Sequence, residues 1–177
     1  MKHNVRLLDQ LNILLGRVMR LTYMVLFGWW LDIPFERRQE RQLAREVRDV
    51  LAFLFDDYGG EIVPNGRVPH AFGYALVMVA IGTLLLRFGR GRGDFTVQVA
   101  ARGHTSEWSD WKDLQIIQMV LHESDDTADF PRLFGLYDAE RLLRAELPRL
   151  LDATSEEHWD IVKGKANALF PLPMRIR

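Results

Sequence analysis

The chain has 177 residues, of which 48% are hydrophobic and 27% are charged. These are the proportions of an ordinary globular protein, so a buried core is expected and disorder of the whole chain is not. The formal net charge of −1 argues against a general attraction to nucleic acid, and the absence of cysteine excludes disulfides, thiolate zinc sites, iron–sulfur clusters and cysteine nucleophiles.

The first predicted element is a long helix over about residues 4–30. Its apolar residues recur at steps of three and four and spread beyond one face. Such a helix needs cover from more than one side, so we expect the rest of the domain or a second chain to bury it. Because Arg17 and Arg20 interrupt the apolar run of residues 11–31, that run is too short to span a bilayer. A helix lying on a membrane surface, with Trp29 and Trp30 at the interface, is a second interpretation.

A second helix is predicted from about Pro34 to Tyr58, after a break at residues 32–34. One side of this helix is apolar and carries Leu43, Val47, Val50 and Leu54. The opposite side carries a row of arginines, Arg37, Arg41, Arg45 and Arg48. Guanidinium groups in a row can bind carboxylates or phosphates bidentately. A solvated face, neutralised within the helix by Glu36, Glu40 and Glu46, is the alternative.

The middle of the chain predicts β-structure. Residues 74–81 are continuously apolar, as in a strand covered on both faces, and residues 83–88 begin another strand. Residues 94–101 alternate between apolar and polar. Together they predict a three-stranded antiparallel meander, which a short strand at residues 61–63 would extend.

A glycine-spaced segment, residues 89–93, joins the second and third of these strands. A phosphate-binding loop would need Lys-Ser or Lys-Thr after its last glycine and a helix behind it. Asp94 and a strand follow instead, so we expect a hairpin turn. Arg90 and Arg92 in this segment, and Arg87 just before it, remain weak candidates for contact with a phosphate or an acidic partner.

The last third of the chain is predicted to be helical. After a loop at residues 102–112, helical spacing returns at residues 113–123 and again at residues 138–151, where Pro148 should kink or end the helix. A final helix, capped by residues 154–157, is expected to reach about Phe170.

These elements predict an α+β fold, in which a small antiparallel sheet of about three or four strands is packed by N-terminal and C-terminal helices. Residues 1–60 form a helical hairpin in this interpretation. Residues 61–177 form an α+β core with the C-terminal helices, and the two parts make one compact unit.

Residues suited to catalysis are few and poorly spaced. None of the five histidines pairs with another at the four-residue spacing of a helical zinc site. The nearest approach to a ligand group is His104 with Glu107 and Asp110 in the predicted loop, and His122 with residues 125–126 is a weaker one. The sequence therefore predicts no metal, no cofactor and no catalytic residue. A metal-dependent hydrolase or nuclease-like enzyme using the first group is the alternative.

Tryptophans and charge point instead to a macromolecular partner. Trp108 and Trp111 lie in the predicted loop, where tryptophans often anchor protein interfaces, although burial is an equal possibility. Residues 122–160 hold eleven acidic and four basic residues, a local balance of −7. This balance is typical of an acidic surface that faces a basic partner, or of solvated helix faces.

One stretch, residues 82–121, has a recognisable order of motifs. It contains Leu84-Leu85-Leu86-Arg87-Phe88, then Arg92-Gly93-Asp94-Phe95, then apolar alternation to Val99, then Trp111-Lys112-Asp113-Leu114. The stretch covers under a quarter of the chain and is similar to small uncharacterised bacterial immunity-like proteins, which are found beside toxin or defence genes. The resemblance implies a binding protein without catalytic residues.

We therefore expect a bacterial protein–protein interaction module rather than an enzyme. The cysteine-free composition fits a cytoplasmic location. The partner is expected to be another protein, in a hetero-complex or a homo-oligomer, and nucleic acid is not expected. The predicted partner-binding residues are the four arginines of the second helix and Trp29, Trp30, Trp108 and Trp111.

Overall fold

The computed structural model describes residues 29–64, 75–91, 94–104, 110–124 and 133–169, with side chains from Arg38 onward in the first helix. Residues 1–39 and 40–177 are two separate compact units, and the second contains the sheet. The predicted hairpin of residues 1–60 lies partly outside the described residues and stays a prediction. The elements in chain order are α2 (Trp29–Val50), α3 (Ala52–Asp56), β1 (Glu61–Val63), β2 (Ala75–Ile81), β3 (Leu84–Arg90), β4 (Phe95–Ala101), β5 (Lys112–Asp113), α4 (Leu114–Leu121), α5 (Leu136–Ala153) and α6 (Trp159–Leu169).

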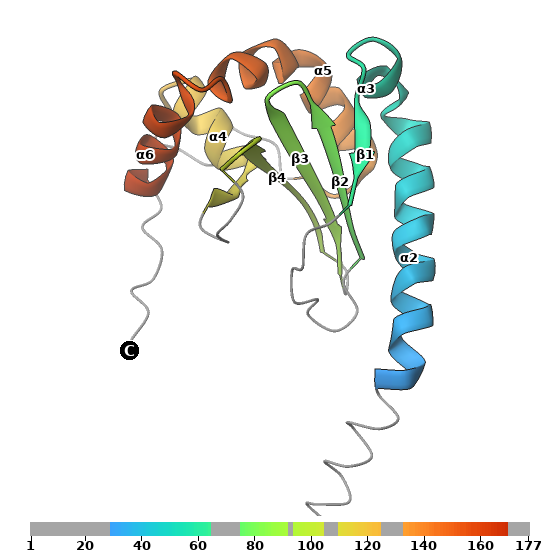
Figure 1. The fold of residues 1–177 in the computed structure, drawn as a ribbon. Helices are drawn as coiled ribbons and strands as arrows, with labels where there is room; N and C mark the ends of the chain where they lie inside the picture. Colours follow the sequence, from blue (N-terminus) through green and yellow to red (C-terminus); the bar gives the residue numbers. More distant parts are fainter. Residues whose placement is uncertain (1–28, 65–74, 92–93, 105–109, 125–132, 170–177) are drawn as a thin grey trace, which may run out of the picture. The chain divides into compact units, whose positions relative to one another are not determined.

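The sheet has five antiparallel strands in the order β1-β2-β3-β4-β5 (Figure 1). The predicted α+β class, the meander of β2, β3 and β4, and the extension by β1 are all confirmed. The strand count of three or four was too low because β5 was not predicted. This strand pairs Lys112 with Val99 and Asp113 with Gln98, and two residues are too few to show an alternating pattern.

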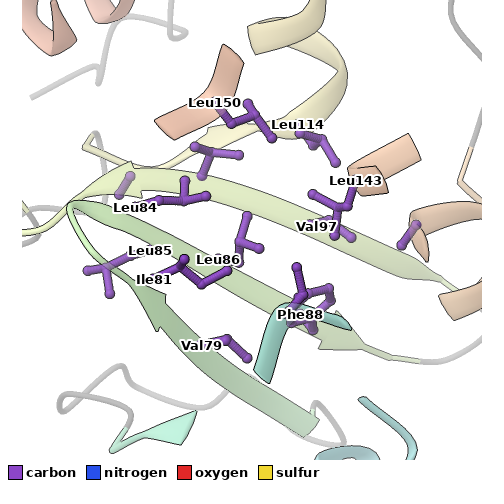
Figure 2. Close-up of a cluster of buried hydrophobic side chains, with 14 of the residues drawn as sticks. Val79, Ile81, Leu84, Leu85, Leu86, Phe88, Val97, Leu114, Leu143 and Leu150 are labelled. Carbon is purple, nitrogen blue, oxygen red and sulfur yellow. The ribbon is translucent and has the colours of Figure 1, made fainter. Parts of the chain in front are cut away.

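One face of the sheet carries the main core. Val79, Leu86 and Val99 are direct cross-strand neighbours and have no exposed surface. Figure 2 shows leucines of α4 and α5, among them Leu114 and Leu143, over this face. Burying such a side chain stabilises the fold by about 1.5–3 kcal/mol, so this face holds the helices to the sheet.

The opposite face of the sheet is also buried, as the continuous apolar run of β2 predicted. Ala80, Leu85 and Ala100 are cross-strand neighbours at 5%, 6% and 0% exposure. The next row on this face consists of Met78, Arg87, Gln98 and Asp113, each paired with the next across the sheet, and the last three of these are polar. We call Arg87, Gln98 and Asp113 the polar strip.

Helix α2 differs from its predicted boundaries at both ends. The predicted break at residues 32–34 is wrong, because the helix already includes Trp29 and continues through Pro34 to Val50. A proline removes one helical hydrogen bond, and this loss does not end a helix whose later turns are anchored by buried Leu43 and Val47. A turn at residue 51 then separates α2 from α3. The predicted left-handed glycine stop is confirmed at Gly59, whose φ is +64°.

Helices α5 and α6 confirm the predicted helical C-terminal part, with two differences. Pro148 does not end α5, which continues to Ala153. The Thr154 hydroxyl donates a hydrogen bond of 2.8 Å to the Leu150 carbonyl, so Thr154 closes α5 instead of capping the next helix, which begins only at Trp159. Among the described helices, none is long and apolar enough to cross a membrane.

Candidate interaction site

Three predicted arginines lie on the exposed side of α2. Arg41, Arg45 and Arg48 are solvent-exposed, whereas Leu43 and Val47 on the other side are buried at 1% and 0% exposure. The helical rise of 1.5 Å per residue spreads the three arginines over about 10 Å. We call these three residues the arginine face. Because the apolar side is fixed in the core, the backbone that presents the arginine face is held in place.

Glu46, one of the three glutamates of α2, pairs with residues outside the arginine face. Glu46 accepts a hydrogen bond of 2.9 Å from Gln42 and forms an ion pair of 2.5 Å with Arg90 of β3. The hydrogen bond from Arg90 lowers the pKa of the Glu46 carboxyl below its usual value. Among the described residues, no carboxylate forms an ion pair with Arg41, Arg45 or Arg48. Their positive charge therefore faces solvent.

An aromatic ring orients one of these arginines. The guanidinium carbon of Arg48 lies 5.3 Å from the centre of the Phe55 ring in α3. A guanidinium stacked on a ring keeps its N–H groups pointing outward for hydrogen bonds. Arg48 is thus partly preorganised to bind an anionic group.

Comparisons with known proteins gave no matching family model, curated protein or solved structure.

The other predicted partner-binding residues have different outcomes. Arg37, Trp29 and Trp30 belong to α2, but their side chains lie outside the description, as does all of Trp108. Trp111 is 8% exposed, and the guanidinium carbon of Arg87 lies 4.1 Å from the centre of its ring. The prediction of Trp111 as a surface anchor needs correction, because pairing of the following residues as β5 draws its ring against the sheet.

Sequence reasoning also missed the polar strip. Arg87 was grouped with the turn arginines, but it is 1% exposed. Its Nε and Nη2 donate hydrogen bonds of 2.9 and 2.5 Å to Gln98 Oε1, and Gln98 Nε2 donates one of 3.0 Å to Asp113 Oδ1. Burial lowers the pKa of Arg87 to about 10, and the negative charge of Asp113 acts in the opposite direction. Strand alternation was the available signal, since it places Arg87 on the face opposite Leu86.

The predicted loop group of the enzyme alternative is not assembled in the described residues. Asp110 is buried, and its carboxylate is paired with Lys163 of α6. His104 is partly buried and Glu107 lies outside the described part. Within that part, no group of three or more histidine and acidic side chains could hold a metal ion. The Asp110–Lys163 pair instead links the β5 region to α6.

A second link between β5 and α6 is made by a buried lysine. Lys112 is 7% exposed, and its ammonium donates a hydrogen bond to Asn167. Burial lowers the pKa of Lys112, and the positive charge of Lys163 lowers it further. Both contacts serve to fix α6 beside the sheet edge.

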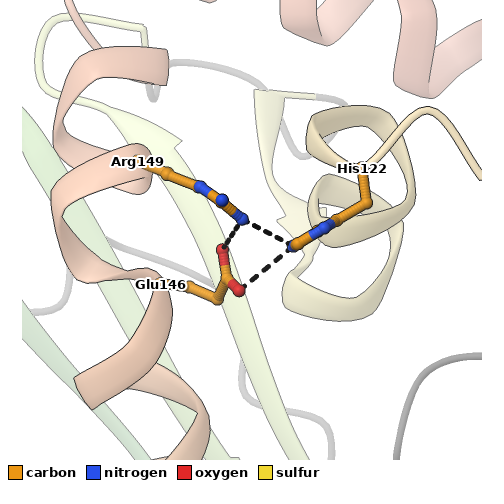
Figure 3. Close-up of polar contacts among 3 residues, drawn as sticks. All are labelled: His122, Glu146 and Arg149. Carbon is orange, nitrogen blue, oxygen red and sulfur yellow. Dashed lines mark hydrogen bonds and ion pairs between the residues drawn. The ribbon is translucent and has the colours of Figure 1, made fainter.

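A further polar cluster joins α4 to α5. His122, the residue that follows α4, lies beside Glu146 and Arg149 of α5 (Figure 3). The weaker ligand group predicted for His122 used residues 125–126, which lie outside the description. Its described partners come instead from a helix that begins more than ten residues later, and sequence spacing gave no signal for that contact.

Proposed function

We propose that this protein is a cytoplasmic bacterial interaction module, which uses the arginine face of α2 to bind an acidic surface of another protein. The resemblance of residues 82–121 to immunity-like proteins supports a more specific role for the module. That role is an immunity protein or an accessory subunit of a toxin or phage-defence system.

The observation that carries this proposal is the combination of anchoring and free charge on α2. A helix anchored by buried leucine and valine loses little conformational freedom when a partner binds. The three arginines of the arginine face are exposed and form no ion pair with a described carboxylate, so a partner's carboxylates do not have to displace described ones. Arginine is also enriched at protein interfaces because its planar group binds carboxylates bidentately.

Recovery of the partner from native cells tests the proposal. A tagged copy of the full chain is purified from its own host, and the bound protein is identified and its affinity measured. The variant Arg41→Glu/Arg45→Glu should weaken binding by at least about tenfold. The substitution removes two positive charges that attract the partner's carboxylates and adds two negative charges that repel them. Binding of the unaltered chain should also weaken as salt is raised.

The matched control reverses the same amount of charge elsewhere. Arg102 and Lys165 are both exposed and lie outside α2, so Arg102→Glu/Lys165→Glu should leave the affinity within about twofold of the unaltered chain, because reversing a distant exposed charge changes little. Equal affinity of the two double variants would contradict the proposal. Recovery of nucleic acid in place of an acidic protein would contradict it as well.

A further inference from the structure

One ring nitrogen in the α4–α5 cluster makes two contacts of opposite kind. Nε2 of His122 lies 3.1 Å from Glu146 Oε1, a hydrogen-bond acceptor. The same nitrogen lies 3.1 Å from Arg149 Nη1, a hydrogen-bond donor. Arg149 Nη1 is itself 3.4 Å from the other carboxylate oxygen of Glu146, so the three groups form a closed triangle (Figure 3).

The two contacts of His122 cannot both be hydrogen bonds at the same time. An imidazole nitrogen carries either a proton or a lone pair, in one direction in the plane of the ring. With a lone pair, Nε2 accepts from Arg149 and faces the Glu146 oxygen without a proton between them. With a proton, Nε2 donates to Glu146 and faces the N–H group of Arg149. The triangle therefore has two alternative bonding patterns.

We propose that His122 is a proton-operated switch between α4 and α5. The neutral ring accepts a hydrogen bond from Arg149, which also pairs with Glu146. Protonation gives Nε2 a proton, which it donates to the Glu146 carboxylate, and the ring no longer accepts from Arg149. Histidine is suited to this role because its charge changes within the physiological pH range.

Exposure decides which cation leaves when the ring becomes charged. The triangle then holds two positive groups and one carboxylate. The Glu146 side chain is 10% exposed, that of His122 is 35% exposed and that of Arg149 is 58% exposed. The most exposed cation loses least by returning to water, so Arg149 is the group that separates and His122 stays paired with Glu146.

Charged side chains of α5 contact the His122 ring. Glu146 offers a carboxylate and Arg149 a guanidinium to the same ring nitrogen. Glu123 follows on the same turn and is exposed. Lys165 of α6 lies with Glu123 around a cavity of about 350 Å³, which Met119 and Val120 of α4 also line. The switch therefore sits at the end of α4, where this helix meets both α5 and the cavity.

Nuclear magnetic resonance of the full chain, labelled with nitrogen-15, tests the switch directly. At alkaline pH the His122 ring should carry its proton on Nδ1 and leave Nε2 unprotonated. As the pH falls, the side-chain resonances of Arg149 should shift with the same midpoint as those of His122. In His122→Asn the pH dependence of the Arg149 resonances should be lost.

His158 supplies a control within the same molecule. Its Nδ1 lies 3.3 Å from Asp152 Oδ1, and no described arginine contacts its ring. Titration of His158 should therefore shift no arginine resonance. The proposal is overturned if the neutral His122 ring carries its proton on Nε2, or if the Arg149 resonances stay constant while His122 titrates. Both results come from the unaltered chain and do not require a variant to fold.

Discussion

The substitution Gln98→Leu tests whether the polar strip is held together by its central amide. Gln98 accepts two N–H groups of Arg87 and donates to Asp113. Leucine has a similar size but neither accepts nor donates. The substitution would therefore remove the Gln98 acceptor from a nearly fully buried guanidinium, while the apolar packing of the sheet changes little.

The expected loss of stability follows from the bonds removed. A hydrogen bond to a charged group contributes about 1.5–3 kcal/mol. The two bonds from Arg87 share one acceptor oxygen, so we count them as little more than one. The bond to Asp113 is exposed and adds about 0.5–1 kcal/mol. We therefore expect Gln98→Leu to lower the free energy of unfolding by about 2–4 kcal/mol.

A double-mutant cycle separates the loss of the interaction from other effects. Replacing a buried charged network with apolar side chains of similar volume is often neutral, so Arg87→Met/Gln98→Leu should unfold within about 1.5 kcal/mol of the unaltered chain. Urea unfolding at fixed pH and salt measures these free energies of unfolding. The slope of the free energy against urea concentration should be the same for every variant. Thr96→Val, on the same strand and face, is the control and should change stability by under about 0.5 kcal/mol. A loss below about 1 kcal/mol for Gln98→Leu, or losses that simply add in the double variant, would refute the reasoning.

Two further predictions concern an ion pair and the glycines. The hydrogen bond from Arg90 lowers the pKa of Glu46 in the folded protein below 4.5, the value taken for the unfolded chain. The ionised Glu46 carboxylate therefore stabilises the fold above pH 4.5, and this stabilisation is lost as the pH falls through the lower pKa of the folded protein. The stability difference between the unaltered chain and Glu46→Gln should thus shrink in acid, as measured by urea unfolding across pH, and a constant difference would contradict the assignment. A Cβ on Gly60 would lie 2.6 Å from the Leu54 carbonyl oxygen, whereas one on Gly164 in α6 meets nothing within 4 Å. Thermal unfolding should show Gly60→Ala destabilised by about 1–3 kcal/mol and Gly164→Ala stabilised by about 0.5–1 kcal/mol, and shifts of the same sign would show that local space does not decide the outcome.

Much of the fold could be predicted because local patterns carry it. Continuous apolar runs and strict alternation identified the central strands, and the three- and four-residue spacing of α2 placed Arg41, Arg45 and Arg48 on the exposed side. The helix boundaries were less accurate, because Pro34 and Pro148 weaken a helix locally while buried side chains on the following turns hold it. The two-residue strand β5 left no periodic signal at all.

The polar contacts of the candidate site and its surroundings could not be predicted in the same way. Arg87 meets Gln98 only because β3 and β4 pair in one particular register, and Trp111 is buried only because β5 joins the sheet. His122 and Glu146 are 24 residues apart, one directly after α4 and the other in α5. Contacts of this kind depend on how whole elements pack, which composition and spacing do not specify.

The polar strip also bears on how the chain finds the correct alignment of its strands. Side chains on both faces of β2 and β3 are largely apolar, so sliding β4 by two residues would return apolar groups to the same faces at little cost in burial. Such a slide would bring Arg87 opposite Thr96 or Ala100 in place of Gln98. The hydrophobic effect alone would stabilise these shifted alignments almost as well as the native one. The hydrogen bonds between the buried Arg87 guanidinium and the Gln98 amide form only in the native alignment and therefore distinguish it.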